Sequence, residues 1–101
     1  LPPAVAGIGL LAAFADGEPA PGPLTFESVY RAFFHDVSRW ARAIGGPGVD
    51  HEDVTQEVFL VVRKKLARFD GRNLPGWLYR ITTFKVRAQK RRAWLRRAVR
   101  L

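Results

Sequence analysis

The sequence contains no cysteine, and no carboxylate side chain follows Asp70. The missing cysteines exclude a disulfide framework and a thiolate metal site, so nothing in the composition requires an oxidising compartment. The two histidines, His35 and His51, lie far apart without ligand-like spacing and are expected at the surface or its boundary. Since neither a Gly-rich phosphate loop nor a Ser/His/Asp or Cys/His set is present, we predict no enzyme and no cofactor.

Long hydrophobic runs are also missing. The apolar opening from Leu1 to Ala15 is too short to span a bilayer, and no positive stretch precedes it, so neither a membrane partner nor a signal peptide is predicted. The expected location is therefore cytoplasmic. With 101 residues, including seven Phe, three Trp and two Tyr, the chain is long enough for one small domain with a single core.

The first 24 residues are predicted to stand apart from this domain. Residues 16–23 are rich in Pro and Gly, and prolines lack the amide donor that regular structure needs, so this part is a linker by composition. The apolar part before it has two interpretations. One is a short helix packed on the domain or on a neighbour, and the other is a segment disordered in solution.

From Thr25 onward, apolar side chains recur at intervals of three and four, which predicts an all-α fold. The expected architecture is a compact bundle of three main helices, at about 25–44, 50–68 and 74–98, within a domain of residues 25–101. Thr25, Asp50 and Asn73 are placed to cap the helix starts, and Asp53 lies where a capping box with Asp50 would need it. The first two helices are expected to bury Phe26, Val29, Tyr30, Phe33, Phe34, Val37, Trp40, Ala41 and Ile44, and Val54, Val58, Val61, Val62, Leu66 and Phe69.

The last helix is expected to have an apolar side and a cationic side, because its sequence is amphipathic at about 100° per residue. The apolar sector comprises Leu74, Trp77, Leu78, Ile81, Phe84, Ala88 and Leu95. Roughly opposite lie Arg80, Arg87, Lys90, Arg91 and Arg97, with Tyr79, Thr83 and Trp94 among them.

The charges are divided unevenly along the chain. Residues 71–101 hold ten cationic side chains and no carboxylate, a net charge of +10, whereas residues 1–70 hold seven cations and nine carboxylates, a net charge of −2. A segment this basic repels itself, so an anionic partner is favoured, and cations interleaved with rings suit nucleic acid. The alternative is a solvated face of long side chains.

Two further features lie next to this basic face. The 50–68 helix has a second face with Asp53, Gln56, Glu57, Leu60 and Lys64. One apolar member in a polar stripe indicates a partner-binding surface, and an isolated exposed leucine is the alternative. The turn-rich loop 68–76, with Asp70, Arg72 and Asn73, can form a pocket for one base or serve only as a connection.

Three segments taken together resemble bacterial sigma factors, and most closely region two of the extracytoplasmic-function (ECF) group. They are Asp50-His-Glu-Asp-Val-Thr-Gln-Glu-Val-Phe59, Arg68-Phe-Asp-Gly71 and Gly76-Trp-Leu-Tyr-Arg-Ile81. The resemblance covers roughly residues 26–97. It implies a sigma factor domain that binds core RNA polymerase and melts the minus-ten promoter element, with an anti-sigma factor as a further partner.

The resemblance also implies which residues carry each role. The surface for the clamp helices of the polymerase β′ subunit would comprise Asp53, Gln56, Glu57 and Leu60. Segment 69–74 matches the part of the family that holds a base flipped out of the non-template strand. The residues assigned to DNA are Arg72, Asn73, Trp77, Tyr79, Arg80, Thr83, Phe84, Arg87, Lys90 and Arg91.

Two positions depart from the family pattern. Phe84 stands where Asn is frequent, and Arg87 stands where Asp is usual. Because a phenyl ring cannot make a bidentate hydrogen bond to a base edge, either the preferred promoter is unusual or Phe84 is core, and its apolar sector favours core. For Trp77, core is likewise favoured over a stacking platform.

The chain ends at Leu101, where family members continue to a helix-turn-helix region, so a fragment is expected. Two other functions remain open at this point. One is a regulatory interaction module held chiefly by an anti-sigma factor. The other is a basic helical bundle that binds DNA without sequence preference.

Overall fold

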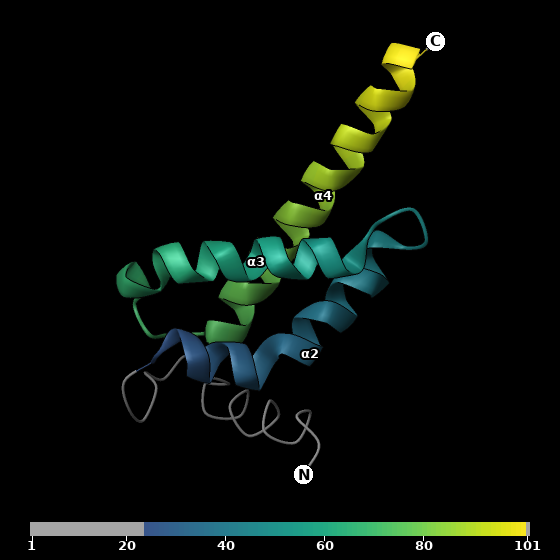
Figure 1. The fold of residues 1–101 in the computed structure, drawn as a ribbon. Helices are drawn as coiled ribbons and strands as arrows, with labels where there is room; N and C mark the ends of the chain where they lie inside the picture. The colour runs from purple at the N-terminus through teal and green to yellow at the C-terminus, as the bar shows by residue number, and fades with distance from the viewer. Residues whose placement is uncertain (1–23, 101) are drawn as a thin grey trace.

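The computed structural model describes residues 24–100, which form three α-helices and one short 3₁₀ turn (Figure 1). The elements are α2 (Phe26–Gly45), α3 (His51–Lys65), η1 (Leu66–Arg68) and α4 (Leu74–Arg100). Each α-helix packs against the other two, and this part of the chain contains no strand. The predicted all-α bundle of three main helices is confirmed. The N-terminal apolar segment and its linker lie outside the described residues.

Local capping explains where α2 begins. The Thr25 hydroxyl accepts a hydrogen bond from the Ser28 amide at 3.0 Å, and the Ser28 hydroxyl accepts one from the Thr25 amide at 3.1 Å. This reciprocal pair satisfies two amides that the helix itself leaves unpaired. The helix therefore starts one residue after its predicted cap.

The start of α3 is capped differently from the prediction. The Asp50 carboxylate accepts from the Asp53 amide at 3.1 Å, as expected, but Asp53 does not complete a capping box. Instead the Asp50 amide donates to Oε1 of Gln89 at 2.8 Å, and Nε2 of Gln89 donates to Oδ2 of Asp53 at 3.0 Å. A side chain of α4 therefore replaces the predicted local partner.

The core consists mainly of small aliphatic side chains from all three helices. Its fully buried members are Val29, Phe33, Val37, Ala41, Val54, Val58, Val62, Leu74, Leu78 and Val86. Burying each side chain of valine size or larger contributes about 1.5–3 kcal/mol, which makes this cluster the main source of stability.

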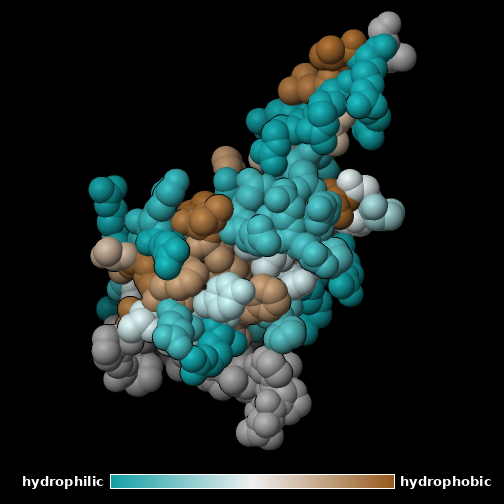
Figure 2. Space-filling model, in the orientation of Figure 1, coloured by the Kyte–Doolittle hydropathy of each residue, from teal (hydrophilic) through white to brown (hydrophobic). Residues whose placement is uncertain are grey.

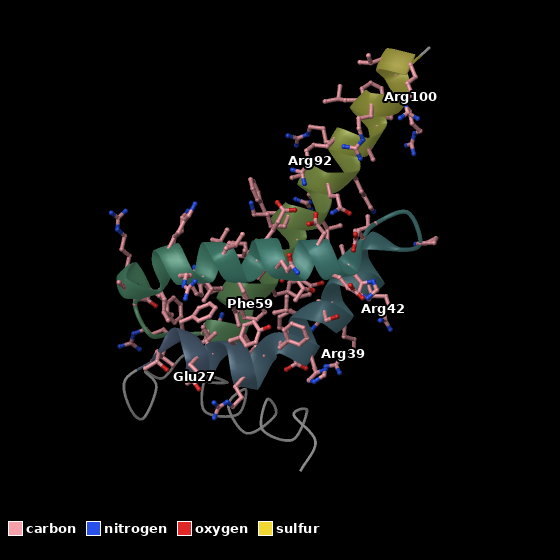
Figure 3. All side chains as sticks on the ribbon, viewed as in Figure 1. Glu27, Arg39, Arg42, Phe59, Arg92 and Arg100 are labelled. Atoms are coloured by element: carbon pink, nitrogen blue, oxygen red, sulfur yellow. The ribbon has the colours of Figure 1, made fainter. Side chains whose placement is uncertain are left out.

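A ring cluster closes the core between α2 and α3. Phe59 was not in the predicted apolar stripe, yet it is buried and points from α3 toward α2 (Figure 3). The rings of Phe26, Tyr30 and Phe34 surround it, with centroids 4.9–6.3 Å away. Tyr30, predicted to be core, is 41% exposed because it covers Phe59 from the solvent side.

The buried face of α4 differs from the predicted apolar sector. Leu74, Leu78, Thr82 and Val86, four residues apart, are the ones that are fully buried. Thr82 tolerates burial because its hydroxyl donates to the carbonyl of Leu78 at 2.8 Å. The rest of the predicted sector is half-buried at best.

Phe84 and Leu95 are the main errors in that sector, being 66% and 48% exposed. The prediction of Phe84 as core is therefore wrong. Phe84 lies on the outer side of α4, at the edge of a hollow between α3 and α4, and Leu95 lies beyond the point where α2 and α3 could cover it.

The C-terminal turns of α4 extend away from the body formed by the other helices (Figure 1). At 1.5 Å per residue the whole helix is about 40 Å long, more than the bundle can cover. Trp94, Leu95 and Val99 are consequently exposed, and Figure 2 shows apolar atoms among hydrophilic ones on this protruding end. None of the described helices is both long enough and apolar enough to span a membrane.

Replacing Gly45 with Ala should destabilise the fold, because the added methyl group would lie 2.7 Å from Cβ of Val49. Overpacking of this kind costs about 1–3 kcal/mol, more than alanine gains in a helix. Urea denaturation followed by circular dichroism should show the loss. Gly48→Ala is the matched control, since its methyl group would meet nothing within 4 Å. Equal unfolding curves for the two variants would contradict the packing argument.

Candidate nucleic-acid and partner interface

The outer face of α4 carries cations that have no counter-ion. Arg80, Arg87 and Arg91 recur at spacings of seven and four, are exposed, and form no ion pair within residues 24–100. At about 100° per residue they lie on the side opposite the buried stripe. The structure thus brings these three predicted residues together in one row.

An aromatic side chain lies within this row. Phe84 projects into solvent between Arg80 and Arg87, with Nζ of Lys85 6.0 Å from the centroid of its ring. Thr83, next to it, donates its hydroxyl to the carbonyl of Tyr79 at 3.0 Å, so its donor is already used within the helix. Exposed rings among cations are the side chains with which single-stranded nucleic acids stack.

Two other residues assigned to DNA lie at the edge that meets α2. The ring of Tyr79 makes an edge contact with Trp40, with centroids 5.3 Å apart. Nζ of Lys90 donates to the carbonyl of Ile44 at 3.4 Å, in the last turn of α2. These side chains therefore contribute to helix packing as well as to the charge of the face.

The loop before α4 has a fixed shape. The Asp70 carboxylate accepts from the Arg72 amide at 2.9 Å, and the Asn73 side chain accepts from the Gly76 amide at 3.2 Å. The predicted cap by Asn73 is thus confirmed, in the left-handed backbone conformation with φ 51°. A Cβ at position 76 would lie 2.4 Å from Nδ2 of Asn73, so only glycine fits beside this cap.

This loop and the first turns of α4 enclose an open pocket of about 420 Å³. The rings of Phe69 and Trp77 stack in it, with centroids 4.5 Å apart and planes at 23°. Trp77 is half-buried, so the same ring packs against the core and lines the pocket. The full lining is Arg68, Phe69, Asp70, Arg72, Asn73, Trp77 and Arg80.

A second hollow, of about 400 Å³, lies between α3 and α4. It shares Trp77 and Arg80 with the loop pocket, so the two are neighbours. Its other lining residues are Val61, Lys65, Ile81, Phe84 and Lys85.

The predicted partner surface on α3 is only partly free. Gln56 and Leu60 are exposed, Leu60 at 57%, and Asp53 is exposed while holding Gln89. The Glu57 side chain, 24% exposed, lies against two cations of α4. These residues are not locked inside the protein, yet two of them already have partners.

The side chains that supply those partners had no predicted role: they are Lys85, Gln89 and Arg92. They lie at spacings of four and three on α4 and face the carboxylates at the start of α3. The signal in the sequence for this contact was that carboxylates on α3 and cations on α4 each recur at helical spacing. Within residues 24–100, no group of three or more His, Cys, Asp and Glu side chains could hold a metal ion.

Comparison with known proteins supplies the family. The model for sigma-70 region 2 matches residues 29–97, well over half of the sequence. The chain belongs to the sigma-70 region 2 family. The stretch matched covers α3, the loop pocket and nearly all of α4.

A relative of this sigma region 2 domain narrows the group. The domain is 35% identical over 69 residues to the "ECF RNA polymerase sigma factor SigE" of Mycolicibacterium smegmatis, strain ATCC 700084 / mc(2)155. The match covers 68% of this chain and 26% of the relative, so the chain spans about a quarter of that protein's length. The predicted ECF-type sigma factor domain is confirmed. No solved structure gives a significant match.

Replacing Asn73 with Ala should lower the free energy of unfolding by about 1 kcal/mol, because the cap acceptor is lost. The left-handed backbone at this position adds to the cost for alanine. Asn73→Gly, which accepts that backbone, should lose only about a few tenths of a kcal/mol. Thermal unfolding would be followed by circular dichroism. If the glycine variant melts as early as the alanine variant, backbone conformation is not what distinguishes them.

Proposed function

We propose that this sigma factor domain binds core RNA polymerase through α3 and the melted minus-ten promoter element through α4 and the loop before it. The observation that carries the proposal is the row of unpaired Arg side chains on α4 that continues into a ring-lined pocket. Family membership supports the same function, and the matched relative is named as an RNA polymerase sigma factor.

The DNA half of the proposal follows from charge and shape. Arg80, Arg87 and Arg91 lie in one row from which each can contact a phosphate, and such contacts fix register without reading sequence. One unstacked base of the non-template strand would enter the loop pocket, where Trp77 and Phe69 offer flat surfaces. Opened DNA makes these contacts and duplex does not, so binding itself supplies free energy for melting. The domain consumes no nucleotide and acts as a binding module.

We expect Phe84 to determine which base this domain prefers at the position that it contacts. Its exposed ring can stack on a base but cannot read a base edge by hydrogen bonds. We therefore expect discrimination at the contacted position to follow stacking strength rather than a donor and acceptor pattern.

The polymerase half rests on the exposed part of α3. Leu60 is the exposed apolar side chain that an interface on the β′ clamp helices would bury, with Gln56 one turn away for a polar contact. Because Leu60 would serve an anti-sigma factor equally well, such a protein would mask the domain by occupying this surface.

Selection from a randomised single-stranded oligonucleotide pool should enrich one short sequence, which should bind more tightly than its scrambled form or its duplex. Arg80→Gln should weaken binding about three- to tenfold and reduce the salt slope by about 0.7, the value for one phosphate contact on a single strand. Arg31→Gln, which removes the same charge from α2, is the control. Fluorescence anisotropy at several salt concentrations measures both. Equal affinity for selected and scrambled strands would indicate a nonspecific DNA-binding bundle.

Leu60→Ala should weaken capture by an immobilised β′ clamp-helix segment about tenfold, because truncating a central apolar contact costs about 1–2 kcal/mol. Gln56→Ala should have a smaller effect in the same direction. Val99→Ala is the matched control, since Val99 is an exposed apolar residue on the protruding end of α4. Equal capture of all three variants and the natural chain would exclude this surface as the docking site.

A further inference from the structure

Glu57 forms a contact that the proposed function does not use. Its Oε1 lies 3.8 Å from Nζ of Lys85, and its Oε2 accepts a hydrogen bond from Nη2 of Arg92 at 3.2 Å. Both cations come from α4, and Figure 3 shows Arg92 where this helix leaves the body of the domain. One carboxylate therefore serves two cations of the helix assigned to DNA.

The register that produces this contact is fixed by a neighbouring one. Gln89, between Lys85 and Arg92 on α4, holds both the amide of Asp50 and the carboxylate of Asp53. Since these bonds join the two helices one turn before Glu57 on α3, Glu57 has little freedom to face elsewhere. The contact of Glu57 with Lys85 and Arg92 is thus part of the packing of α3 against α4.

Among residues 24–100, Glu57 is the one carboxylate that forms salt bridges with α4. The cations of α4 consequently fall into two classes. Arg80, Arg87 and Arg91 have no counter-ion, whereas Lys85 and Arg92 are partly neutralised. Lys85 also lines the hollow between α3 and α4 beside Arg80 and Phe84, next to the path proposed for DNA.

We propose that Glu57 is a counter-ion shared between the two surfaces, so that binding of polymerase and binding of DNA are cooperative. The idea rests on the proposed function. In the free domain Glu57 holds Lys85 and Arg92. A docking partner that presents Arg or Lys to α3 draws the carboxylate away and leaves two more cations of α4 for phosphates.

Linkage makes the effect reciprocal. If docking releases cations that strengthen DNA binding, DNA that takes those cations must strengthen docking by the same factor. The partner surface must then combine a cation for Glu57 with an apolar site for Leu60, which lies one turn further along α3. This chemistry excludes an acidic surface as the occupant of α3.

The first experiment contains DNA and no polymerase. A fluorescein-labelled single-stranded 20-mer of mixed sequence is titrated with the full chain and with Glu57→Gln. The variant should bind about threefold more tightly, with a salt slope steeper by up to about 1.4, because two cations become available. Glu52→Gln removes the same charge from an exposed site on α3 without a cross-helix partner, and should change affinity less than about 1.5-fold. Equal effects of the two variants would overturn the proposal.

A double variant distinguishes the effect of the released cations from the effect of removing one negative charge. Glu57→Gln combined with Arg92→Gln should lose most of the gain, and its salt slope should return toward that of the natural chain. Circular dichroism melting shows whether each variant is folded at the temperature of the titration. A double variant that keeps the full gain would also overturn the proposal.

The second experiment adds a soluble β′ clamp-helix segment at saturation. The segment should increase the affinity of the natural chain for the 20-mer about threefold and should leave the affinity of Glu57→Gln unchanged, since its cations are already free. A segment that binds without changing DNA affinity overturns the cooperativity. A segment that fails to bind in direct titration overturns the docking surface of the proposed function, whereas the first experiment decides the counter-ion role by itself.

Discussion

The packing of α3 against α4 is the contact on which the rest of the structure depends. Val54, Val58 and Val62 of α3 and Leu78 and Val86 of α4 are fully buried members of one core cluster. This layer places a helix whose first turn is acidic beside a helix that has no carboxylate. Apolar burial supplies about 1.5–3 kcal/mol for each side chain, whereas an exposed ion pair supplies about 1 kcal/mol at most. The polar rim therefore sets the register of the two helices, and the valines set the strength of their association.

The same contact allows α4 to carry an unfavourable surface. Like charges four residues apart, as at Arg87 and Arg91, destabilise a helix by about 0.2–0.5 kcal/mol for each pair. An isolated helix with this sequence would lose stability from that repulsion, but α4 is anchored through its first half by the core. An anionic ligand on the outer face relieves the repulsion. Under the proposed function, part of the affinity for DNA is thus already present as repulsion between charges in the free domain.

Local features of the fold could be predicted from the sequence, and features that depend on distant contacts could not. The caps at Thr25 and Asn73 involve residues three apart, so their chemistry is visible in the sequence. The side chains of Phe84 and Leu95 were misplaced because a helical period says nothing about where the neighbouring helices end. The contact between Gln89 and Asp53 joins residues 36 apart and follows only from the packed structure.

The functional features divide in the same way, into those visible in short sequence motifs and those that depend on distant contacts. The ordered segments on α3, the loop and α4 identified the family, because they are short motifs with fixed spacing. The sequence names Phe69 and Trp77 as pocket residues but does not give their relative orientation, since their stacking depends on the conformation of the loop. That Glu57 faces α4 as well as solvent required the coordinates of both helices.

Because α4 is one continuous helix, a tilt at one of its ends displaces the other end. No glycine or proline interrupts it after Gly76, and the turns after Arg92 protrude from the bundle. That part is about 12 Å long, so a tilt of about 10° at the core displaces the tip by about 2 Å. Any reorientation of the half of α4 that is anchored in the core is thereby transmitted, enlarged, to whatever Arg100 touches.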